Sequence, residues 1–288
     1  MSGKVAIIDC GTNTFHLLIC SIYYQKGVIL PEAEERDIDI LTKFRQIIDD
    51  YKVTTIYAFG TSAFRNATNG NALRDRINNK LHLNLKIISG LVEAEYIYKG
   101  VNYALNIKED VTMVMDIGGG SVEFVIGKEQ EIYWKKSFEI GGQRMVERFH
   151  HSDPISTLEI ELLEKYLTKN LGELFAALDR LKPSILGGSS GTFDTLSDIY
   201  CSKKGIIVDD QVPERPFDLS QYAEIHDQLI TKNRADRLQI PGMIPMRVDM
   251  IVVASCLINF ILKNYSFQGI RVSTYSLKEG ALSEMITI

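Results

Sequence analysis

The chain has 288 residues, and 45% of them are hydrophobic, which is enough for a sizeable core in one large or two medium domains. The net charge is −5 and the isoelectric point is about 5.6, so we expect no bulk attraction to nucleic acid or to an anionic membrane. No apolar stretch reaches the length of a membrane span and no signal peptide is recognisable, which favours a cytoplasmic location.

Short apolar runs alternate with amphipathic segments in the first part of the chain, a pattern typical of α/β proteins. We predict strands at residues 5–9, 15–22, 55–59 and 85–89. We predict helices at residues 32–51, 71–81 and 92 to about 104. The series therefore opens with two strands joined by a tight turn and continues with alternating helices and strands.

The same order starts again near residue 110. We predict strands at residues 111–116, 122–126, 132–139, 184–186 and 269–274. We predict helices at residues 143–150, 156 to about 181, 219–232, 248–263 and 278–285. The sequence therefore predicts a duplicated α/β fold with an N-terminal domain of residues 1–109, a C-terminal domain of residues 110–288 and a cleft between them. The last helix, at about residues 279–288, is expected to return to the N-terminal domain.

Three glycine-rich stretches each follow a predicted strand: "AIIDCGTNTF", "VMDIGGGSVEF" and "GGSSGTF". A glycine-rich turn lets several backbone N–H groups approach one anion, and hydroxyl and amide side chains add donors. The candidate phosphate ligands in these loops are Gly11, Thr12, Asn13, Thr14, Gly118, Gly119, Gly120, Ser121, Gly188, Ser189, Ser190 and Gly191. One such loop alone is usually an ordinary turn, but three in repeated contexts favour phosphate binding.

An aspartate precedes each of the first two loops, Asp9 and Asp116. A carboxylate there would repel phosphate directly, but it fits if it holds a divalent cation such as Mg²⁺ that touches the phosphate. Two facing hairpins, each with an aspartate, would clamp a nucleotide or a phosphate chain in the cleft. The alternative for Asp9 is a residue that only caps a turn.

Seven motifs occur in order over nearly the whole chain: "IDCGTNTFHLLI", "GTSAFRNATN", "ISGLVEAE", "DIGGGSVEFVIG", "GGSSGTF", "IPGMIPMRVDMIVVA" and "YSLKEGAL". This ordered set resembles the exopolyphosphatase / guanosine pentaphosphate phosphohydrolase (Ppx/GppA) family in its short two-domain form. The resemblance implies two actin-like ATPase (ribonuclease H-like) domains, as in the actin, hexokinase and Hsp70 group. It also implies hydrolysis of a terminal phosphoryl group from inorganic polyphosphate, guanosine pentaphosphate or both, with Mg²⁺ or a similar cation.

The resemblance assigns roles to individual residues. It implies that Glu93 is the general base, which must reach the attacking water. It implies that Asp116 holds the metal with Asp9 as its first-loop counterpart, and that Glu123 acts on the metal or on the water. Arg65 and Ser62 would hold phosphate oxygens. Without the motifs, we would interpret Glu93 as a solvent-exposed glutamate on an amphipathic helix and Arg65 as a solvent-exposed arginine at a strand end.

The sequence departs from the family pattern at three points. Val92 replaces the first glutamate of the usual pair, and Glu95 stands where an arginine is common. Between residues 22 and 39 the chain lacks roughly two dozen residues that would make a further strand and loop.

Two other functions stay open from the sequence: a kinase-like enzyme that moves phosphate to a small acceptor, and a non-catalytic sensor of polyphosphate or guanosine phosphates. The "GTSAFR" segment together with Glu93 argues against the kinase, whereas Val92 and Glu95 keep the sensor open. We interpret the apolar stretch at residues 248–262 as a core helix and leave a homodimer interface there open. The preferred substrate and the preferred cation are also left open.

Overall fold

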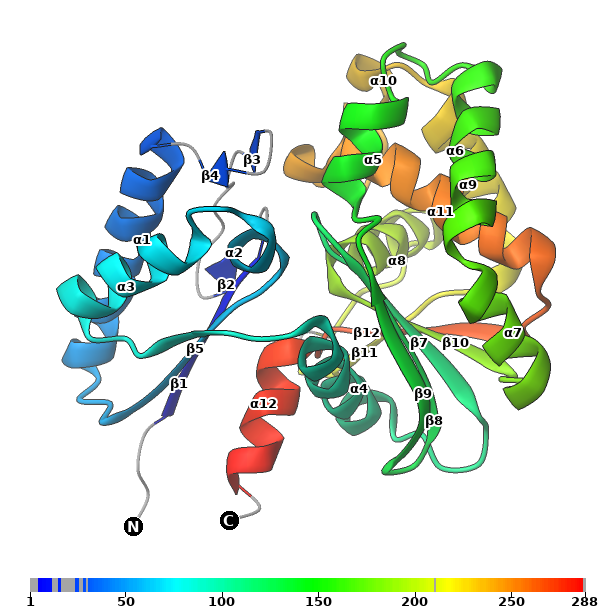
Figure 1. Ribbon diagram of the computed structural model, residues 1–288. Helices are drawn as coiled ribbons and strands as arrows, with labels where there is room; N and C mark the ends of the chain where they lie inside the picture. The colour runs from blue at the N-terminus through cyan, green and yellow to red at the C-terminus, as the bar shows by residue number, and fades with distance from the viewer. Residues whose placement is uncertain are drawn as a thin grey trace.

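A computed structural model describes the protein at residues 5–11, 15–16, 24–25, 28–29, 31–209 and 211–286. Figure 1 shows two parts side by side, each built around its own sheet. The predicted ligands Thr12, Asn13 and Thr14 lie outside the described residues, as do residues 17–22 of the second predicted strand. Within the described part of the chain, no helix is both long and apolar enough to cross a membrane.

The first sheet has the strand order β2-β1-β5-β6. Its strands are β1 (Val5–Cys10), β2 (Phe15–His16), β5 (Thr55–Gly60) and β6 (Leu85–Ile87), and a separate pair is formed by β3 (Tyr24–Gln25) and β4 (Val28–Ile29). The helices of this part of the chain are α1 (Pro31–Asp50), α2 (Ser62–Asn66), α3 (Gly70–Leu81) and α4 (Gly90–Leu105). β1 and β2 are antiparallel, whereas β5 and β6 continue the sheet in parallel.

The second sheet has the order β11-β12-β10-β7-β8-β9. Its strands are β7 (Thr112–Ile117), β8 (Val122–Lys128), β9 (Glu131–Phe138), β10 (Ile185–Ser189), β11 (Glu214–Arg215) and β12 (Gly269–Ser273). The helices are α5 (Gly142–Phe149), α6 (Thr157–Asn170), α7 (Gly172–Leu181), α8 (Ser190–Lys204), α9 (Tyr222–Thr231), α10 (Arg234–Leu238), α11 (Met250–Asn264) and α12 (Leu277–Ile286), with 3₁₀ turns at Leu219–Gln221 and Pro245–Arg247.

The two sheets repeat one arrangement, which confirms the predicted duplicated α/β fold. In each sheet an antiparallel hairpin (β1–β2 or β7–β8) is followed by two parallel strands (β5 and β6, or β10 and β12). Asp9 is the second-last residue of β1, and Asp116 is the second-last residue of β7. The repeat therefore places the two predicted metal ligands at matching points of the two sheets.

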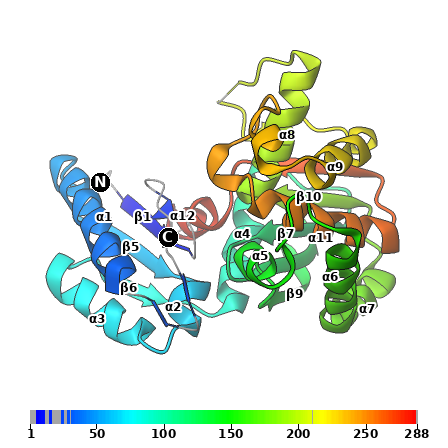
Figure 2. The ribbon, with the colours of Figure 1, turned by 90° about the horizontal axis from the view of Figure 1, so that it is seen from above.

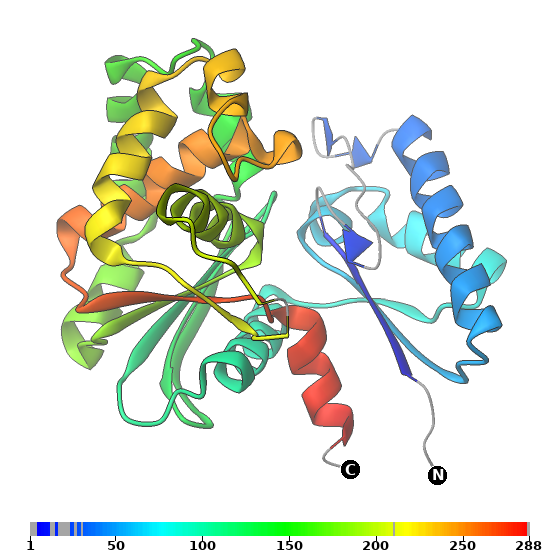
Figure 3. The same cartoon turned by 180° about the vertical axis from the view of Figure 1, so that it is seen from behind.

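Helices α4 and α12 cross between the two sheets, as Figures 2 and 3 show. The crossing is close because a Cβ on Gly100 would lie 2.0 Å from the carbonyl oxygen of Ser276, and one on Gly280 would lie 1.7 Å from that of Tyr96. This contact packs the middle of α4, at Tyr96 and Gly100, against the start of α12. α12 contacts both α4 and β1, while the boundary after residue 109 stays a prediction.

Several predicted elements differ from the observed ones. The single helix expected at residues 156–181 is two helices, because Leu171 leaves helical geometry between α6 and α7. Its start is as predicted, with Ser156 and Glu159 forming a capping box. Helices α2, α8 and α10 were not predicted. Helices α2 and α8 each begin inside a loop rich in Gly, Ser and Thr that hides the helical period.

Candidate active site

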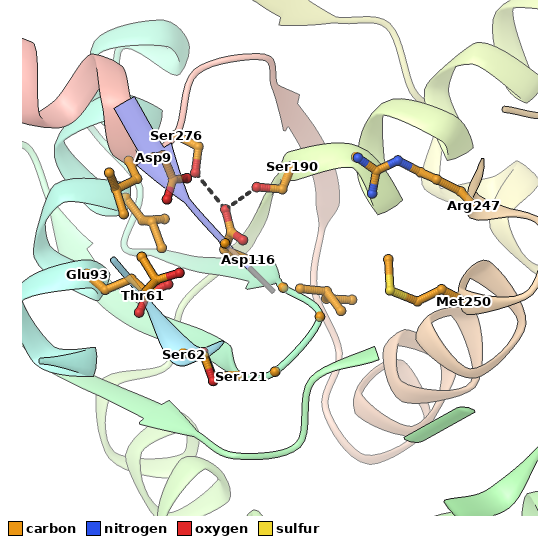
Figure 4. Close-up of a pocket in the computed structure, with 18 residues that line it drawn as sticks. Asp9, Thr61, Ser62, Glu93, Asp116, Ser121, Ser190, Arg247, Met250 and Ser276 are labelled. Carbon is orange, nitrogen blue, oxygen red and sulfur yellow. Dashed lines mark hydrogen bonds between the residues drawn. The ribbon is translucent and has the colours of Figure 1, made fainter. Parts of the chain in front are cut away.

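One pocket lies where the two sheets face each other, and Figure 4 shows the side chains around it. Asp9 and Glu93 lie on one side, Asp116 lies in the middle, and Arg247 lies on the opposite side with Met250. The pocket is lined by Asp9, Gly11, Thr61, Ser62, Glu93, Ile97, Asp116, Ile117, Gly118, Gly119, Gly120, Ser121, Ser190, Gly191, Arg247, Met250, Ser276 and Leu277. Among the predicted site residues, Arg65, Glu123, Gly188 and Ser189 do not line it.

Asp116 is held by three hydroxyl groups. Its Oδ2 accepts hydrogen bonds from Ser189 Oγ at 2.6 Å, Ser190 Oγ at 2.6 Å and Ser276 Oγ at 2.7 Å. Two of these bonds are drawn in Figure 4. Ser189 is the register partner of Asp116 across the parallel pair β7–β10, so strand pairing alone brings them together. The hydroxyl donors fix the carboxylate and leave its other oxygen for a ligand.

Ser190 follows β10 directly and begins α8 with a positive φ of 65°. A left-handed backbone is uncommon for a residue with a side chain and is found often at ligand sites. Here it turns the chain so that the Ser190 hydroxyl reaches Asp116. Gly188, one of the predicted phosphate ligands, instead lies inside β10, where a Cβ would come within 2.1 Å of the Phe193 ring.

Asp9 has the matching position in the first sheet but different surroundings. Its Oδ1 is buried and has no hydrogen-bond partner among the described residues. Burial raises the pKa of Asp9 well above its ordinary value, and the charges of Glu93 and Asp116 raise it further. A buried carboxylate oxygen without a partner is unfavourable, so this position suits a bound cation or an ordered water.

Glu93 lies in the first turn of α4, where its side chain is 10% exposed. Arg65 Nη1 donates to Glu93 Oε2 at 2.9 Å and also to the Ile88 carbonyl at 3.1 Å. Burial raises the pKa of Glu93 to about 7, and the Arg65 charge limits that rise. The predicted base and the predicted phosphate-binding arginine therefore form an ion pair that the sequence did not reveal.

The two residues that depart from the family pattern near Glu93 do not line the pocket. Val92 is 38% exposed. Glu95 accepts hydrogen bonds from Lys99 Nζ at 3.0 Å and Lys135 Nζ at 2.5 Å, and these contacts lower its pKa. Its charge is thus balanced by lysines of α4 and β9.

Glu123 faces the same way as Asp116, because the two are direct partners in the antiparallel pair β7–β8. Its side chain is buried, and Ser137 Oγ donates to Glu123 Oε1 at 2.6 Å. Burial raises the pKa of Glu123 well above its usual range, and the charge of Glu93 raises it further. Glu123 therefore lies beside Asp116 on the neighbouring strand, but its side chain does not line the pocket.

The glycine loop between β7 and β8 is bound from behind by the start of α5. The carbonyls of Gly118, Gly119 and Gly120 accept hydrogen bonds from the amides of Gly142, Gln143 and Gly141 at 2.8, 2.9 and 3.2 Å, respectively. In a trans peptide the N–H points opposite to the C=O, so the next three amides point away from α5. The amides of Gly119, Gly120 and Ser121 thus point to the other side of the loop, where such donors can bind an anion.

Arg247 is a pocket residue that sequence reasoning left without a role. It lies in the 3₁₀ turn after "IPGMI" and packs over Gly191, where a Cβ would come within 1.6 Å of Arg247 Cζ. Burial lowers its pKa, whereas the charges of Asp194 and Asp116 oppose that change. In the sequence, Arg247 stood out only as part of the motif "IPGMIPMRVDMIVVA". That motif does not show that residues 191 and 247 are in contact.

The carboxylates here suit a cation that is completed by its substrate. Among the described residues, no three Asp, Glu, His or Cys side chains lie close enough to form a ready-made metal cage. Mg²⁺ usually takes one or two carboxylates and fills its remaining positions with water and phosphate oxygens. The unpartnered Asp9 oxygen, with Asp116 nearby, fits that manner of binding.

Comparisons with known proteins identify the family. The family model of the Ppx/GppA phosphatase family matches residues 4–287. A crystal structure of an exopolyphosphatase from Cytophaga hutchinsonii is 40% identical, with a TM-score of 0.92, and the match covers 98% of this chain and 97% of that chain. An Aquifex aeolicus member of the Ppx/GppA family, 24% identical with a TM-score of 0.79, shows the same fold over 99% of this chain and 98% of that chain.

Two curated relatives are longer proteins. A bifunctional 3-dehydroquinate synthase/phosphatase from Fusobacterium nucleatum is 30% identical over 97% of this chain and 46% of its own length. A guanosine-5'-triphosphate,3'-diphosphate pyrophosphatase from Aeromonas salmonicida is 27% identical over 98% of this chain and 59% of its own length. The chain therefore spans about half the length of these two relatives. With its motifs, its repeated sheets and a family match over almost its whole length, the chain belongs to the Ppx/GppA phosphatase family.

Proposed function

We propose that the protein is an exopolyphosphatase-type hydrolase that releases terminal orthophosphate from inorganic polyphosphate, guanosine pentaphosphate or both. The observation that carries this proposal is the position of Glu93, a buried carboxylate with a pKa of about 7 in the same pocket as the glycine loop and Asp116. The similarity to a Cytophaga exopolyphosphatase supports the same conclusion.

Glu93 is the general base in this proposal. A base works best when its pKa is near the working pH, and about 7 meets that condition. Its carboxylate accepts a proton from a water molecule while the water oxygen attacks the terminal phosphorus. The bridging P–O bond then breaks, and the shortened phosphate chain leaves with the bonding electrons. Arg65 orients the carboxylate through their 2.9 Å contact and keeps part of it ionised.

The opposite side of the pocket binds the phosphate oxygens. The amides of Gly119, Gly120 and Ser121 and the guanidinium of Arg247 provide the donors, and Ser62 and Gly191 line the same space. Phosphoryl transfer needs mainly positioning and charge neutralisation, which such donors supply. These groups thereby hold the terminal phosphate in front of Glu93.

Asp9 and Asp116 would hold a divalent cation, Mg²⁺ or a similar ion, with Glu123 beside Asp116 on the neighbouring strand. When bound, the cation neutralises charge on the phosphate oxygens as a Lewis acid. The protein's own part is to fix Asp116 with three hydroxyl bonds and to leave Asp9 Oδ1 unpaired. The homodimer and the cytoplasmic location stay predictions.

The test is phosphate release from long-chain polyphosphate and from guanosine pentaphosphate with Mg²⁺, for the wild type and Glu93→Gln. We expect the variant to lose activity by at least about 100-fold, the size of a general-base contribution, while still binding substrate. The matched control is Glu95→Gln, two residues away on the same helix but paired with lysines, which should retain wild-type activity. Binding without turnover by the wild type would favour a non-catalytic sensor, and full activity of Glu93→Gln would remove Glu93 as the base.

A further inference from the structure

Glu139, the residue that follows β9, has a carboxylate surrounded by donors from both parts of the molecule. Asn66 Nδ2 and Arg144 Nη2 each donate to its Oε2 at 2.8 Å, and Ser62 Oγ donates to the same oxygen at 3.2 Å. Arg65 Nη2 lies 3.6 Å from its Oε1. The side chain is 43% exposed, so water could have solvated it without these donors. We name the four residues Ser62, Arg65, Asn66 and Arg144 the anion cradle.

The anion cradle has the chemistry of a phosphate site. It contains two guanidinium groups, one hydroxyl and one amide, which are the side-chain donors that commonly bind phosphate oxygens. One of these donors, Arg65 Nη2, makes no hydrogen bond to Glu139. Arg65 Nη2 is a buried nitrogen without a hydrogen-bond partner among the described residues, and 3.6 Å is too long for such a bond. A group with more oxygens than a carboxylate would engage it.

The anion cradle adjoins the active-site pocket. Ser62 lines the pocket, and Arg65 binds Glu93 through its other nitrogen. Arg144 Nε donates to the Gly120 carbonyl at 2.7 Å, from the side of the loop opposite to its phosphate-facing amides. An anion in the cradle would therefore lie at the edge of the pocket, beside the position assigned to the phosphate chain.

We propose that the anion cradle is a second phosphate subsite and that Glu139 occupies it as an internal anion which the substrate chain displaces. The ligand class is a phosphate unit of a phosphoanhydride chain, and its identity as substrate rests on the proposed function. Glu139 opposes binding in two ways, because it must leave the donors and because its charge repels the incoming phosphate. It therefore weakens the affinity for a phosphate chain, and its removal should strengthen that affinity.

The experiment is isothermal titration of the protein with a methylene-bridged triphosphate chain, which cannot be hydrolysed, in the presence of Mg²⁺. The variants are Glu139→Gln and Glu139→Ala. We expect both to bind about tenfold more tightly than the wild type, equivalent to ~1.4 kcal/mol. The matched control is Glu131→Gln, which removes an exposed charge at the other end of β9 and should not change the affinity.

A double variant separates occupation of the cradle from a general charge effect. Asn66→Ala removes a cradle donor, so combining it with Glu139→Ala should cancel most of the gain. A gain that persists in the double variant, or one that Glu131→Gln reproduces, would reduce Glu139 to a distant charge and overturn the proposal. Unchanged or weaker binding in both Glu139 variants would overturn it as well, since Glu139 would then only join the two parts of the molecule.

The titration does not depend on turnover, so the two proposals can fail separately. If neither the wild type nor any variant releases phosphate from polyphosphate or from guanosine pentaphosphate, but the Glu139 variants still bind the triphosphate chain more tightly, the proposed hydrolase function fails and the subsite stands. If phosphate is released normally and binding is unaffected by Glu139, the subsite fails and the hydrolase function stands.

Discussion

Asp9 and Asp116 occupy matching positions in two sheets of the same design, yet their surroundings are opposite. Asp116 accepts three hydroxyl hydrogen bonds through one oxygen. Asp9 has a buried oxygen with no partner in the described part of the chain, and its pKa is raised well above the ordinary value by burial. Two equivalent positions thus have different surroundings: Asp116 is anchored by hydroxyl groups, whereas Asp9 has a buried oxygen without a partner among the described residues.

Substituting both aspartates gives the largest expected effects and tests this comparison directly. We expect Asp9→Asn and Asp116→Asn each to reduce phosphate release by at least about 100-fold, because each removes a charge assigned to cation binding. The measurement is the steady-state rate of phosphate release at saturating Mg²⁺. An active Asp9→Asn variant would mean that Asp9 only caps a turn.

The same two variants should differ in stability. Asp116→Asn converts three charge-assisted hydrogen bonds to neutral ones, which costs about 2 kcal/mol in free energy of unfolding. Asp9→Asn replaces a buried carboxylate that lacks a partner, so its free energy of unfolding should stay the same or rise. Urea denaturation without divalent cations measures both. Equal losses of stability would show that the two aspartates are satisfied equally well.

The two arginines at the site, Arg65 and Arg247, also differ in their surroundings. Arg65 is bound to Glu93, whereas Arg247 packs over Gly191 on the opposite side of the pocket. Removing Arg247 deprives the phosphate of one charge-assisted contact, so Arg247→Gln should raise KM by roughly 10- to 100-fold. The rate at saturation should change less than KM. A fall in kcat with an unchanged KM would place Arg247 outside substrate binding.

Arg65→Gln should change the pH dependence of kcat instead of KM. Below pH about 7 Glu93 is protonated and cannot accept a proton, so wild-type activity should fall as the pH drops through that value. The charge of Arg65 lowers the pKa of Glu93, and without it the pKa rises further. The acid limb of the kcat–pH profile should therefore move to higher pH in Arg65→Gln and stay in place in Arg247→Gln. An unmoved limb in Arg65→Gln would exclude Glu93 as the titrating base.

Sequence patterns predicted many of the residues that line the pocket, but not the contacts between them. The apolar strands and the loops after them placed Asp9 and Asp116 at strand ends, which the structure shows, and the family motif picked out Glu93. Strand ends and turns are local properties, so a short window of sequence predicts them. The fold class followed from the same local signals, because a repeated order of elements shows in the sequence even when its contacts do not.

The contacts between distant segments were not predictable in this way. Ser276 reaches Asp116, and Glu139 meets Arg65 and Ser62, because α4 crosses α12 at two glycines and because α2 lies against the end of β9. Such contacts depend on how helices and strands that are distant in the sequence pack against one another, and no local sequence pattern predicts that packing. Helix α8 was missed for a related reason, since its first turn looks like a loop until Ser190 is seen to start a helix.

The smallest expected effect comes from substituting Gly191. This substitution tests whether the packing of Arg247 over Gly191 sets the position of the guanidinium group. A Cβ at this position would overlap the guanidinium, so Gly191→Ala must push Arg247 aside. We expect it to raise KM by at most about tenfold, no more than the low end of the range expected for Arg247→Gln. The matched control is Gly172→Ala, where a Cβ meets nothing within 4 Å.

A double-mutant cycle decides whether Gly191 acts through Arg247 or through the start of α8. If the added methyl group works only by displacing the guanidinium, Gly191→Ala combined with Arg247→Gln should have the KM of Arg247→Gln alone. If the two effects add, the methyl group also disturbs the backbone beside Ser190, and through it the hydroxyl that holds Asp116. In that case the Asp116 carboxylate is held less rigidly than its three hydrogen bonds imply. Asp116 and Asp9 would then differ less in how firmly they are held.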